Sequence, residues 1–281
     1  MLDEARLLWR GGGDAGETSR ARRARLRVRT VLSEHPRMYL PVAQRRYPGP
    51  SPRVLDAGTE AVIDGYTRSA STFAVYAFQI PQPEPVRLAH HLHAAAQLME
   101  AARRALPTVV VVREPRGAVL SQVVREPGVD LLDALWAYSR FHESLEPWRD
   151  GFVVADFDEV TADFGAVVTR MNGRFGTSFA AFDGSEEQLA WCRRLVGLRD
   201  TLSPVLLGYE SGEVTAAEVR AHVLALPETA EREVTWMPSP VRDRAKAALD
   251  TAWSEPRLAA AKRRAELAYA RFTGTVDRAV A

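Results

Sequence analysis

The chain has 281 residues, 46% of them hydrophobic, which is enough to bury the core of one large domain. Lys and Arg number 37 against 36 Asp and Glu, and this balance excludes a dedicated nucleic-acid-binding protein, which usually carries a clear basic excess. Cys192 is the single cysteine, which excludes an internal disulfide and a metal site built from cysteines.

The first residues carry charge, and no long apolar stretch follows them, so no signal peptide is indicated. No run approaches the roughly 20 apolar residues that a membrane-spanning helix needs. We therefore expect a cytoplasmic protein that has no membrane span and no nucleic acid as a partner. Composition leaves a homo-oligomer open.

Residues 1–50 are expected to form a basic N-terminal arm or helical extension. Glycines at 11–13 interrupt any early helix, arginines crowd 20–29, and prolines gather around 48–52. The arginine run predicts a solvated helix, and its packing residues are expected to be Leu26, Val28, Val31 and Leu32. A patch for an acidic partner or a membrane surface is the alternative, which the short run disfavours.

Residues 51–281 are predicted to form a single α/β domain in which strands alternate with helices. The expected strands cover 61–66, 86–89, 108–112 and 152–155. The expected helices cover 71–80, 93–106, 116–125, 131–148 and 164–175. This alternation is typical of a central parallel sheet flanked by helices. From about residue 185 the chain is expected to be mainly helical, most clearly at 238–253 and 256–272.

The segment 65–73 leaves the first strand and opens a helix, so its free backbone N–H groups favour a phosphate or sulfate. In the nucleotide-triphosphatase loop Gly-x4-Gly-Lys-Ser/Thr, a lysine occupies the position that Ser71 holds here. Arg68 supplies a positive charge inside the loop instead. The simpler alternative is an ordinary polar turn in which Ser or Thr caps the helix.

The strand predicted over 108–112 ends in Arg113, where nucleotide triphosphatases carry an acidic residue for Mg²⁺. An arginine at the carboxyl end of a parallel strand faces the ligand crevice of such sheets, so it would meet an anion. Ser121 follows eight residues later, about two helical turns along, near enough to contact the same anion. An ion pair of Arg113 with Glu114 is the alternative. No metal site is expected.

These two motifs resemble those of the sulfotransferases that use 3′-phosphoadenosine 5′-phosphosulfate (PAPS) as donor. The segment 67–73 is similar to the family's Pro-Lys/Arg-Ser-Gly-Thr/Ser-Thr-Trp loop. Arg113-Glu114-Pro115-Arg116 with Ser121 matches the second signature, an arginine followed by Asp/Asn-Pro-Arg and a serine eight residues on. His91-Leu92-His93 resembles a looser element that carries the base. The resemblance covers roughly residues 61–176 and implies a P-loop-like sulfotransferase fold.

The resemblance implies transfer of a sulfo group from PAPS to a hydroxyl or amine of a small-molecule, lipid or glycan acceptor, with release of 3′,5′-adenosine bisphosphate (PAP). It assigns the base to His91, with His93 second and His90 third, and gives Arg68 the stabilisation of the leaving phosphate. The residues that it implies for donor binding are Thr67, Arg68, Ser69, Ala70, Ser71, Thr72, Phe73, Arg113 and Ser121.

The sequence departs from the family in three places. Ala70 replaces a glycine of the loop, and Ala89 stands where many cytosolic members have a lysine. The late Arg-Lys-Gly element that binds the 3′-phosphate and adenine has no good copy. Three basic residues could replace it, but their place near the start of an amphipathic helix predicts that they are solvated: Arg242, Arg244 and Lys246.

Two other functions remain as alternatives: an ATP-dependent kinase of the P-loop type, and a non-catalytic nucleotide-binding protein. The acceptor is expected to meet the loops and helices at 83–93 and 131–148 and those after Ser185. Four aromatic residues on the second of these segments are expected to be core rather than acceptor contacts: Trp136, Tyr138, Phe141 and Trp148.

Overall fold

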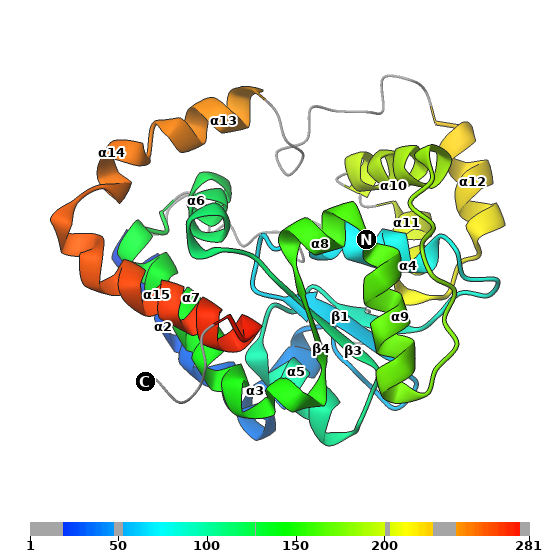
Figure 1. Ribbon diagram of the computed structural model, residues 1–281, viewed down its shortest axis with the longest axis horizontal. Coiled ribbons are helices and arrows are strands. Elements are labelled where there is room, and N and C mark those ends of the chain that lie inside the picture. Colours follow the sequence, from blue (N-terminus) through cyan, green and yellow to red (C-terminus); the bar gives the residue numbers. More distant parts are fainter. Residues whose placement is uncertain (1–18, 48–52, 127, 200–202, 227–239, 276–281) are drawn as a thin grey trace.

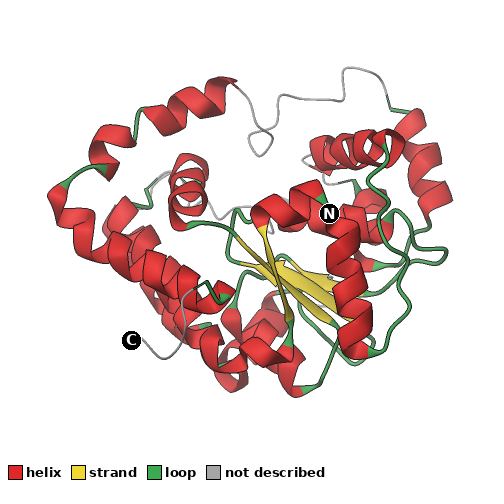
Figure 2. Ribbon diagram, viewed as in Figure 1, coloured by secondary structure: helices red, strands yellow, loops and turns green. Residues whose placement is uncertain are grey.

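The computed structural model describes residues 19–47, 53–126, 128–199, 203–226 and 240–275, and it shows a parallel sheet flanked by helices (Figures 1 and 2). The four strands are β1 (Ala61–Gly65), β2 (Leu88–His90), β3 (Thr108–Val112) and β4 (Val153–Asp156). They lie in the order β2-β1-β3-β4, and every neighbouring pair is parallel. The predicted α/β class with a central parallel sheet is confirmed.

Helices bury both faces of the sheet. Successive side chains of a strand point to opposite faces, so each strand contributes to two hydrophobic clusters. In β1, Ala61 and Ile63 enter one hydrophobic cluster and Val62 enters another. The first cluster lies under α4 (Ser71–Gln79), α9 (Phe164–Phe175), α10 (Glu186–Leu198), α11 (Pro204–Ser211) and α12 (Ala216–Leu224). The second lies under α5 (Ala95–Arg103), α6 (Pro115–Arg125), α7 (Leu131–Leu145) and α15 (Ala259–Thr273). This explains why β3 is apolar throughout.

Several predicted helices begin or end elsewhere in the structure. Helix α7 ends at Leu145 and continues as the 3₁₀ helix η1 (Glu146–Gly151), because Pro147 has no N–H to donate and closes the α-helix. The helix predicted over 238–253 is divided into α13 (Pro240–Ala247) and α14 (Asp250–Trp253). The one predicted over 256–272 begins as η4 (Pro256–Leu258) and continues as α15. A short helix, α8 (Phe157–Ala162), follows β4.

The N-terminal helices pack on the α/β core. Helix α2 (Ser19–Leu32) lies on α7, where Arg23 and Arg27 form ion pairs with Asp133, and α3 (Pro36–Arg46) lies on α5. Val28 and Val31 are exposed, so the prediction that they pack the arm is wrong. The glycines at 11–13 and the prolines at 48–52 lie outside the described residues. No helix in the described ranges has the length and apolarity to cross a membrane.

The chain connections diverge at the carboxyl ends of β1 and β3. The chain leaves β1 into α4 on one face of the sheet, and it leaves β3 into α6 on the other face. In open parallel sheets, ligands bind at such a point, where two neighbouring strands continue to opposite sides. The two motifs singled out in the sequence follow these two strands.

Candidate functional site

The loop from β1 to α4 begins with a glycine that the sheet requires. A β-carbon at Gly65 would lie 2.0 Å from the backbone oxygen of Val111 on β3, a distance that no side chain can adopt. Arg68 and Ala70 then take left-handed backbone conformations, with φ of 71° and 72°. Ala70 is the N-cap of α4 and offers no side-chain hydrogen bond, so no side-chain cap satisfies the first-turn N–H groups.

Two serine hydroxyls of this loop are buried without a hydrogen-bond partner among the described residues. Ser69 is fully buried and Ser71 is 4% exposed, yet neither Oγ atom has a protein acceptor or donor in reach. A buried hydroxyl without a partner costs about 1–3 kcal/mol. The capping alternative for these serines is therefore not realised, and an anion at the helix N-terminus would satisfy both hydroxyls.

The second motif meets the first. Arg68 Nε donates a hydrogen bond to Ser121 Oγ at 2.9 Å, and Arg113 Nη1 donates to the backbone oxygen of Arg68 at 3.3 Å. The Arg113 guanidinium lies over the ring of Phe157, with its carbon 4.1 Å from the centroid. No ion pair joins Arg113 to Glu114 within the described ranges; the Glu114 carboxylate caps α6 by accepting from Gly117 N at 2.6 Å, and its charge opposes the lowering of the Arg113 pKa by burial.

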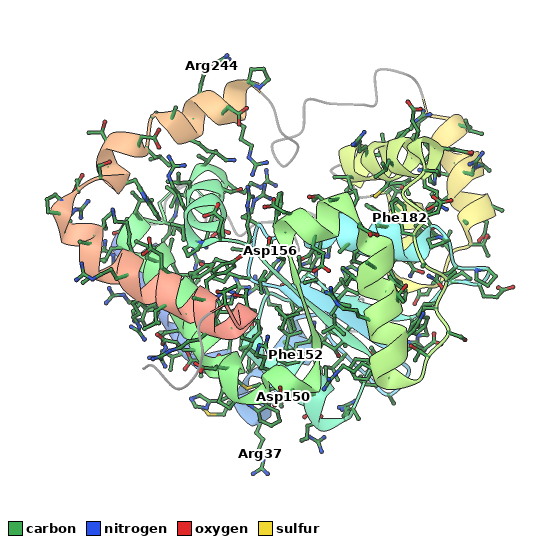
Figure 3. The ribbon with its side chains drawn as sticks, viewed as in Figure 1. Arg37, Asp150, Phe152, Asp156, Phe182 and Arg244 are labelled. Carbon is green, nitrogen blue, oxygen red and sulfur yellow. The ribbon has the colours of Figure 1, made fainter. Side chains whose placement is uncertain are left out.

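A third group, on α13, joins this cluster. Arg242 is only 8% exposed and donates through Nη2 to the Ser121 hydroxyl, so the prediction that it is solvated is wrong. The reason is the packing of α13 on α6, which sequence periodicity does not show. Arg244, in contrast, points away from the body of the protein (Figure 3).

Arg68 and Arg242 are repelled by neighbouring arginines, and Glu126 and Asp243 partly oppose this repulsion. Burial lowers the pKa of Arg68 to about 9, and Arg242, Arg125 and Arg113 lower it further by repulsion. The pKa of Lys246, half-buried on α13, is lowered by burial and by Arg242 and Arg113. Mutual repulsion of this kind identifies a place where an anion is favoured. Residues of three separate segments, near 68, 113–121 and 242–246, therefore gather in one basic cluster.

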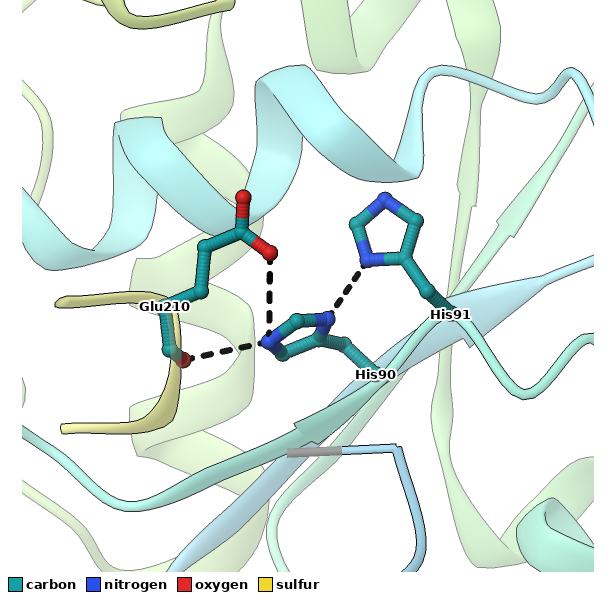
Figure 4. Close-up of side chains that lie close together, drawn as sticks. All are labelled: His90, His91 and Glu210. Carbon is teal, nitrogen blue, oxygen red and sulfur yellow. Dashed lines mark hydrogen bonds and ion pairs between the residues drawn. The ribbon is translucent and has the colours of Figure 1, made fainter. Parts of the chain in front are cut away.

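The predicted histidines lie on the other side of β1, at the end of β2. His91 Nε2 lies 2.9 Å from Thr72 Oγ1, and His91 Nδ1 lies 2.5 Å from His90 Nδ1. His90 Nε2 contacts the backbone oxygen of Glu210 at 3.1 Å, as Figure 4 shows. Burial lowers the pKa of His90 to about 4, against the opposing charge of Glu210, and burial also holds the pKa of His91 well below its usual range. Both imidazoles are therefore neutral near pH 7.

His90, His91 and Glu210 are the one group in the described part of the chain with ligand atoms close enough together for a metal ion. The Glu210 carboxylate is already occupied, since it accepts from Arg199 at 2.7 and 3.0 Å and from Tyr76 at 2.6 Å. The facing Nδ1 atoms are also closer than the roughly 3.3 Å that two imidazoles on a tetrahedral metal require. This group fits a buried polar network better than a metal site.

His93 has different surroundings. Its side chain is 22% exposed, and its Nδ1 lies 2.9 Å from the backbone oxygen of Gly65 and 3.1 Å from Asp64 Oδ1. Sequence reasoning missed Asp64 and the pair Arg199–Glu210. Asp64 carried a signal, because it is the one charged residue in an apolar strand. Arg199 and Glu210 carried none, since acids and bases of helical segments are usually solvated.

The remaining predicted residues contribute packing. Phe73 meets Phe182 edge-on, with ring centroids 6.2 Å apart, and Thr67 is half-buried at the start of the loop. In the aromatic stripe of α7, Tyr138 and Phe141 are core residues, as predicted. Trp136 is half-buried and has the guanidinium groups of two arginines over its ring. Trp148 follows α7 and is 37% exposed, so the prediction of core fails for this residue.

Comparison of the chain with known proteins identified no relative. No protein-family model, no curated protein and no solved structure matches the chain.

Proposed function

We propose that this protein is a sulfotransferase that moves a sulfo group from PAPS to an acceptor hydroxyl or amine. The observation that carries the proposal is the pairing of two features at neighbouring strand ends. One is an uncapped helix N-terminus with the buried, unpartnered hydroxyls of Ser69 and Ser71. The other is the cluster of Arg68, Arg113 and Arg242 around Ser121. Two anion sites so close together suit a donor with a phosphosulfate at its 5′ position and a phosphate at its 3′ position.

Each part of the site would have a distinct task. The N–H groups of the first turn of α4 and the two serine hydroxyls would hold the 5′-phosphosulfate. Arg113, Ser121 and Arg242 would bind the 3′-phosphate through charge-assisted hydrogen bonds. Arg68 lies between the two groups and would stabilise the charge that grows on the leaving phosphate. PAPS itself would supply the activated sulfo group, so in-line placement is the main demand on the protein.

The cluster of histidines at the end of β2 supports an acid–base role on the acceptor side. His90 ends β2, and His91 and His93 follow it, on the side of β1 opposite to β3, after which Arg113 lies. An imidazole that is neutral near pH 7 can take the proton that an acceptor hydroxyl must lose. The acceptor class that we propose is a small molecule, lipid or glycan.

An ATP-dependent kinase is the second candidate, and the site disfavours it. Ser71 stands where the lysine for the β- and γ-phosphates belongs, and Arg113 stands where an acid for Mg²⁺ belongs. A non-catalytic nucleotide-binding protein would keep the same anion sites, so binding alone does not separate it from an enzyme. Turnover of PAPS does.

The test is calorimetric measurement of PAP binding to the full chain without added metal. ATP and AMP are titrated in the same way as control ligands. We expect PAP to bind best, because only PAP places anions at both sites. Arg242→Ala should weaken PAP binding about 10- to 100-fold, the value of one or two charge-assisted hydrogen bonds. Arg113→Ala should have an effect of the same size.

Arg244→Ala is the matched control, since this arginine lies two positions from Arg242 and points into solvent. It should bind PAP within about twofold of the wild type. Preferential binding of ATP that depends on Mg²⁺ would contradict the sulfotransferase proposal and support the kinase. PAP binding without transfer to any acceptor in a broad screen would leave a nucleotide-binding protein.

A further inference from the structure

A buried carboxylate outside both donor motifs organises the acceptor side of the site. Asp64, at the end of β1, is fully buried and accepts hydrogen bonds from the backbone N–H groups of Gly65 at 2.9 Å and of Leu92 and His93 at 3.0 Å. Gln97 Nε2 donates to it at 3.3 Å. Burial by itself would raise the pKa of Asp64, but His93 and the backbone donors lower it below the usual value, so the carboxylate is ionised.

The backbone of the segment after β2 is strained, and Asp64 holds it in place. His91 and His93 both adopt left-handed conformations, with φ of 57° and 51°. Such a conformation is unfavourable for a residue with a β-carbon. The carboxylate of Asp64 binds the N–H groups of Leu92 and His93 and so fixes this turn. Strain maintained by a buried charge is typical of functional sites.

The surroundings of His93 decide which of its nitrogens carries the proton. Nδ1 faces the carbonyl oxygen of Gly65 and the carboxylate of Asp64, and neither atom has a hydrogen to donate. Nδ1 must therefore be the N–H donor, and in the neutral ring Nε2 is left with a free lone pair. The His93 side chain is 22% exposed, whereas His90 and His91 are buried.

The same reasoning gives His91 a different task. His90 Nε2 faces the backbone oxygen of Glu210 and must donate to it, so His90 Nδ1 is the acceptor in the neutral ring. His91 Nδ1 then donates to His90, and His91 Nε2 accepts from the Thr72 hydroxyl. Both nitrogens of His91 are thus engaged inside the protein, and the ring is 7% exposed. His91 orients Thr72 in the donor loop.

We propose that Asp64 and His93 form a carboxylate–imidazole dyad in which His93 is the general base for a hydroxyl acceptor and Asp64 is its positioning residue. This inference rests on the proposed function. The acceptor O–H proton passes to His93 Nε2 while the oxygen forms a bond to sulfur. The bond between sulfur and the bridging phosphate oxygen breaks, and its electron pair stays on the 5′-phosphate of PAP. Asp64 stabilises the imidazolium that forms, and the proton then leaves to water.

The decisive measurement needs no acceptor. ¹⁵N NMR of the histidine-labelled full chain, recorded at a pH where the ring is neutral, should show His93 as the Nδ1–H form, whereas free histidine favours Nε2–H. Diethyl pyrocarbonate should acylate His93 and spare His90 and His91, as peptide mass spectrometry would show. An Nε2–H signature for His93, or acylation of His91 in preference to His93, would overturn the proposal.

Kinetics then separate the dyad from the donor site. With PAPS and 2-naphthol as a probe acceptor, His93→Gln should lower kcat about 10²- to 10⁴-fold while PAP binding stays within about twofold of the wild type. Asp64→Asn should lower kcat and change the ¹⁵N resonance of His93 Nδ1, which loses its carboxylate partner but still donates to the Gly65 carbonyl, while PAP binding stays within about twofold of the wild type. Unchanged turnover in both variants would refute the dyad. If PAP does not bind to the wild type, the donor proposal fails, and the NMR result still decides the state of His93.

Discussion

Acidification should destabilise this protein through its buried histidines, and His142 offers the clearest measure. It is fully buried on α7 among aromatic rings, and its Nδ1 donates to the Tyr138 backbone oxygen at 2.9 Å. Its Nε2 has no partner among the described residues. Burial lowers the pKa of His142 from 6.5 to about 4, so the ring is neutral in the folded protein.

The direction in which stability changes with pH follows from proton uptake on unfolding. Between pH 6.5 and pH 4 the unfolded chain protonates this histidine and the folded protein does not, so stability is full above pH 6.5 and falls as the pH drops. From pH 7 to pH 5 the loss is about 2 kcal/mol for this one group. His90 and His91 add losses of the same direction. Against a total stability of roughly 5–15 kcal/mol, the loss from His142 alone is large enough to measure.

The assay is urea unfolding of wild type and His142→Phe at pH 7, 6 and 5. Phenylalanine keeps the aromatic packing and removes the titrating group, so the variant should lose about 2 kcal/mol less than the wild type between pH 7 and pH 5. His35→Gln is the control, because His35 is exposed on the N-terminal side of the molecule. The stability of His35→Gln should depend on pH as that of the wild type does. An unchanged pH dependence in His142→Phe would refute the assignment of the loss to this ring.

Two further substitutions test the loop and the buried network by chemical unfolding. Ala70→Gly should change the free energy of unfolding by no more than about 1 kcal/mol, since relief of the left-handed backbone offsets the greater freedom of the unfolded chain. Ala70→Val should destabilise more, and a stabilised Val variant would contradict the left-handed conformation. Glu210→Ala should cost about 3–5 kcal/mol, because it removes the carboxylate that forms an ion pair with the buried Arg199 guanidinium, whereas Glu210→Leu combined with Arg199→Met should recover most of the loss. A double variant no more stable than Glu210→Ala would contradict the explanation that the loss comes from breaking the buried ion pair of Arg199 and Glu210.

The strands and most helices could be predicted because their signals are local. Thr108–Val112 is β-branched throughout and lies in the sheet interior, as its composition indicates. Predicted boundaries fail where tertiary contacts decide them. Helix α5 begins at Ala95 rather than at His93, because Asp64 holds residues 91–93 in a turn that the periodicity does not reveal.

The residues of the candidate site also divide into those that local sequence patterns predict and those that only the packing reveals. Arg68, Arg113 and Ser121 could be identified from two motifs because each follows a strand, and strand ends of a parallel sheet meet at one edge. Arg242 could not, since an arginine near the start of an amphipathic helix has the same local pattern whether it is solvated or buried. Only the packing of α13 on α6 distinguishes the two cases.

The strand order accounts for the position of the histidines in the chain. Neighbouring strands lie about 4.8 Å apart, so the groups that follow β2, β1 and β3 stand side by side along one edge of the sheet. In the proposed function, a donor that spans the loop after β1 and the arginine after β3 would leave the β2 side for the acceptor and its base. In a sheet of order β2-β1-β3, the segment that reaches that side is the one following the second strand of the chain. The proposed base His93 accordingly lies between Arg68 and Arg113 in the sequence.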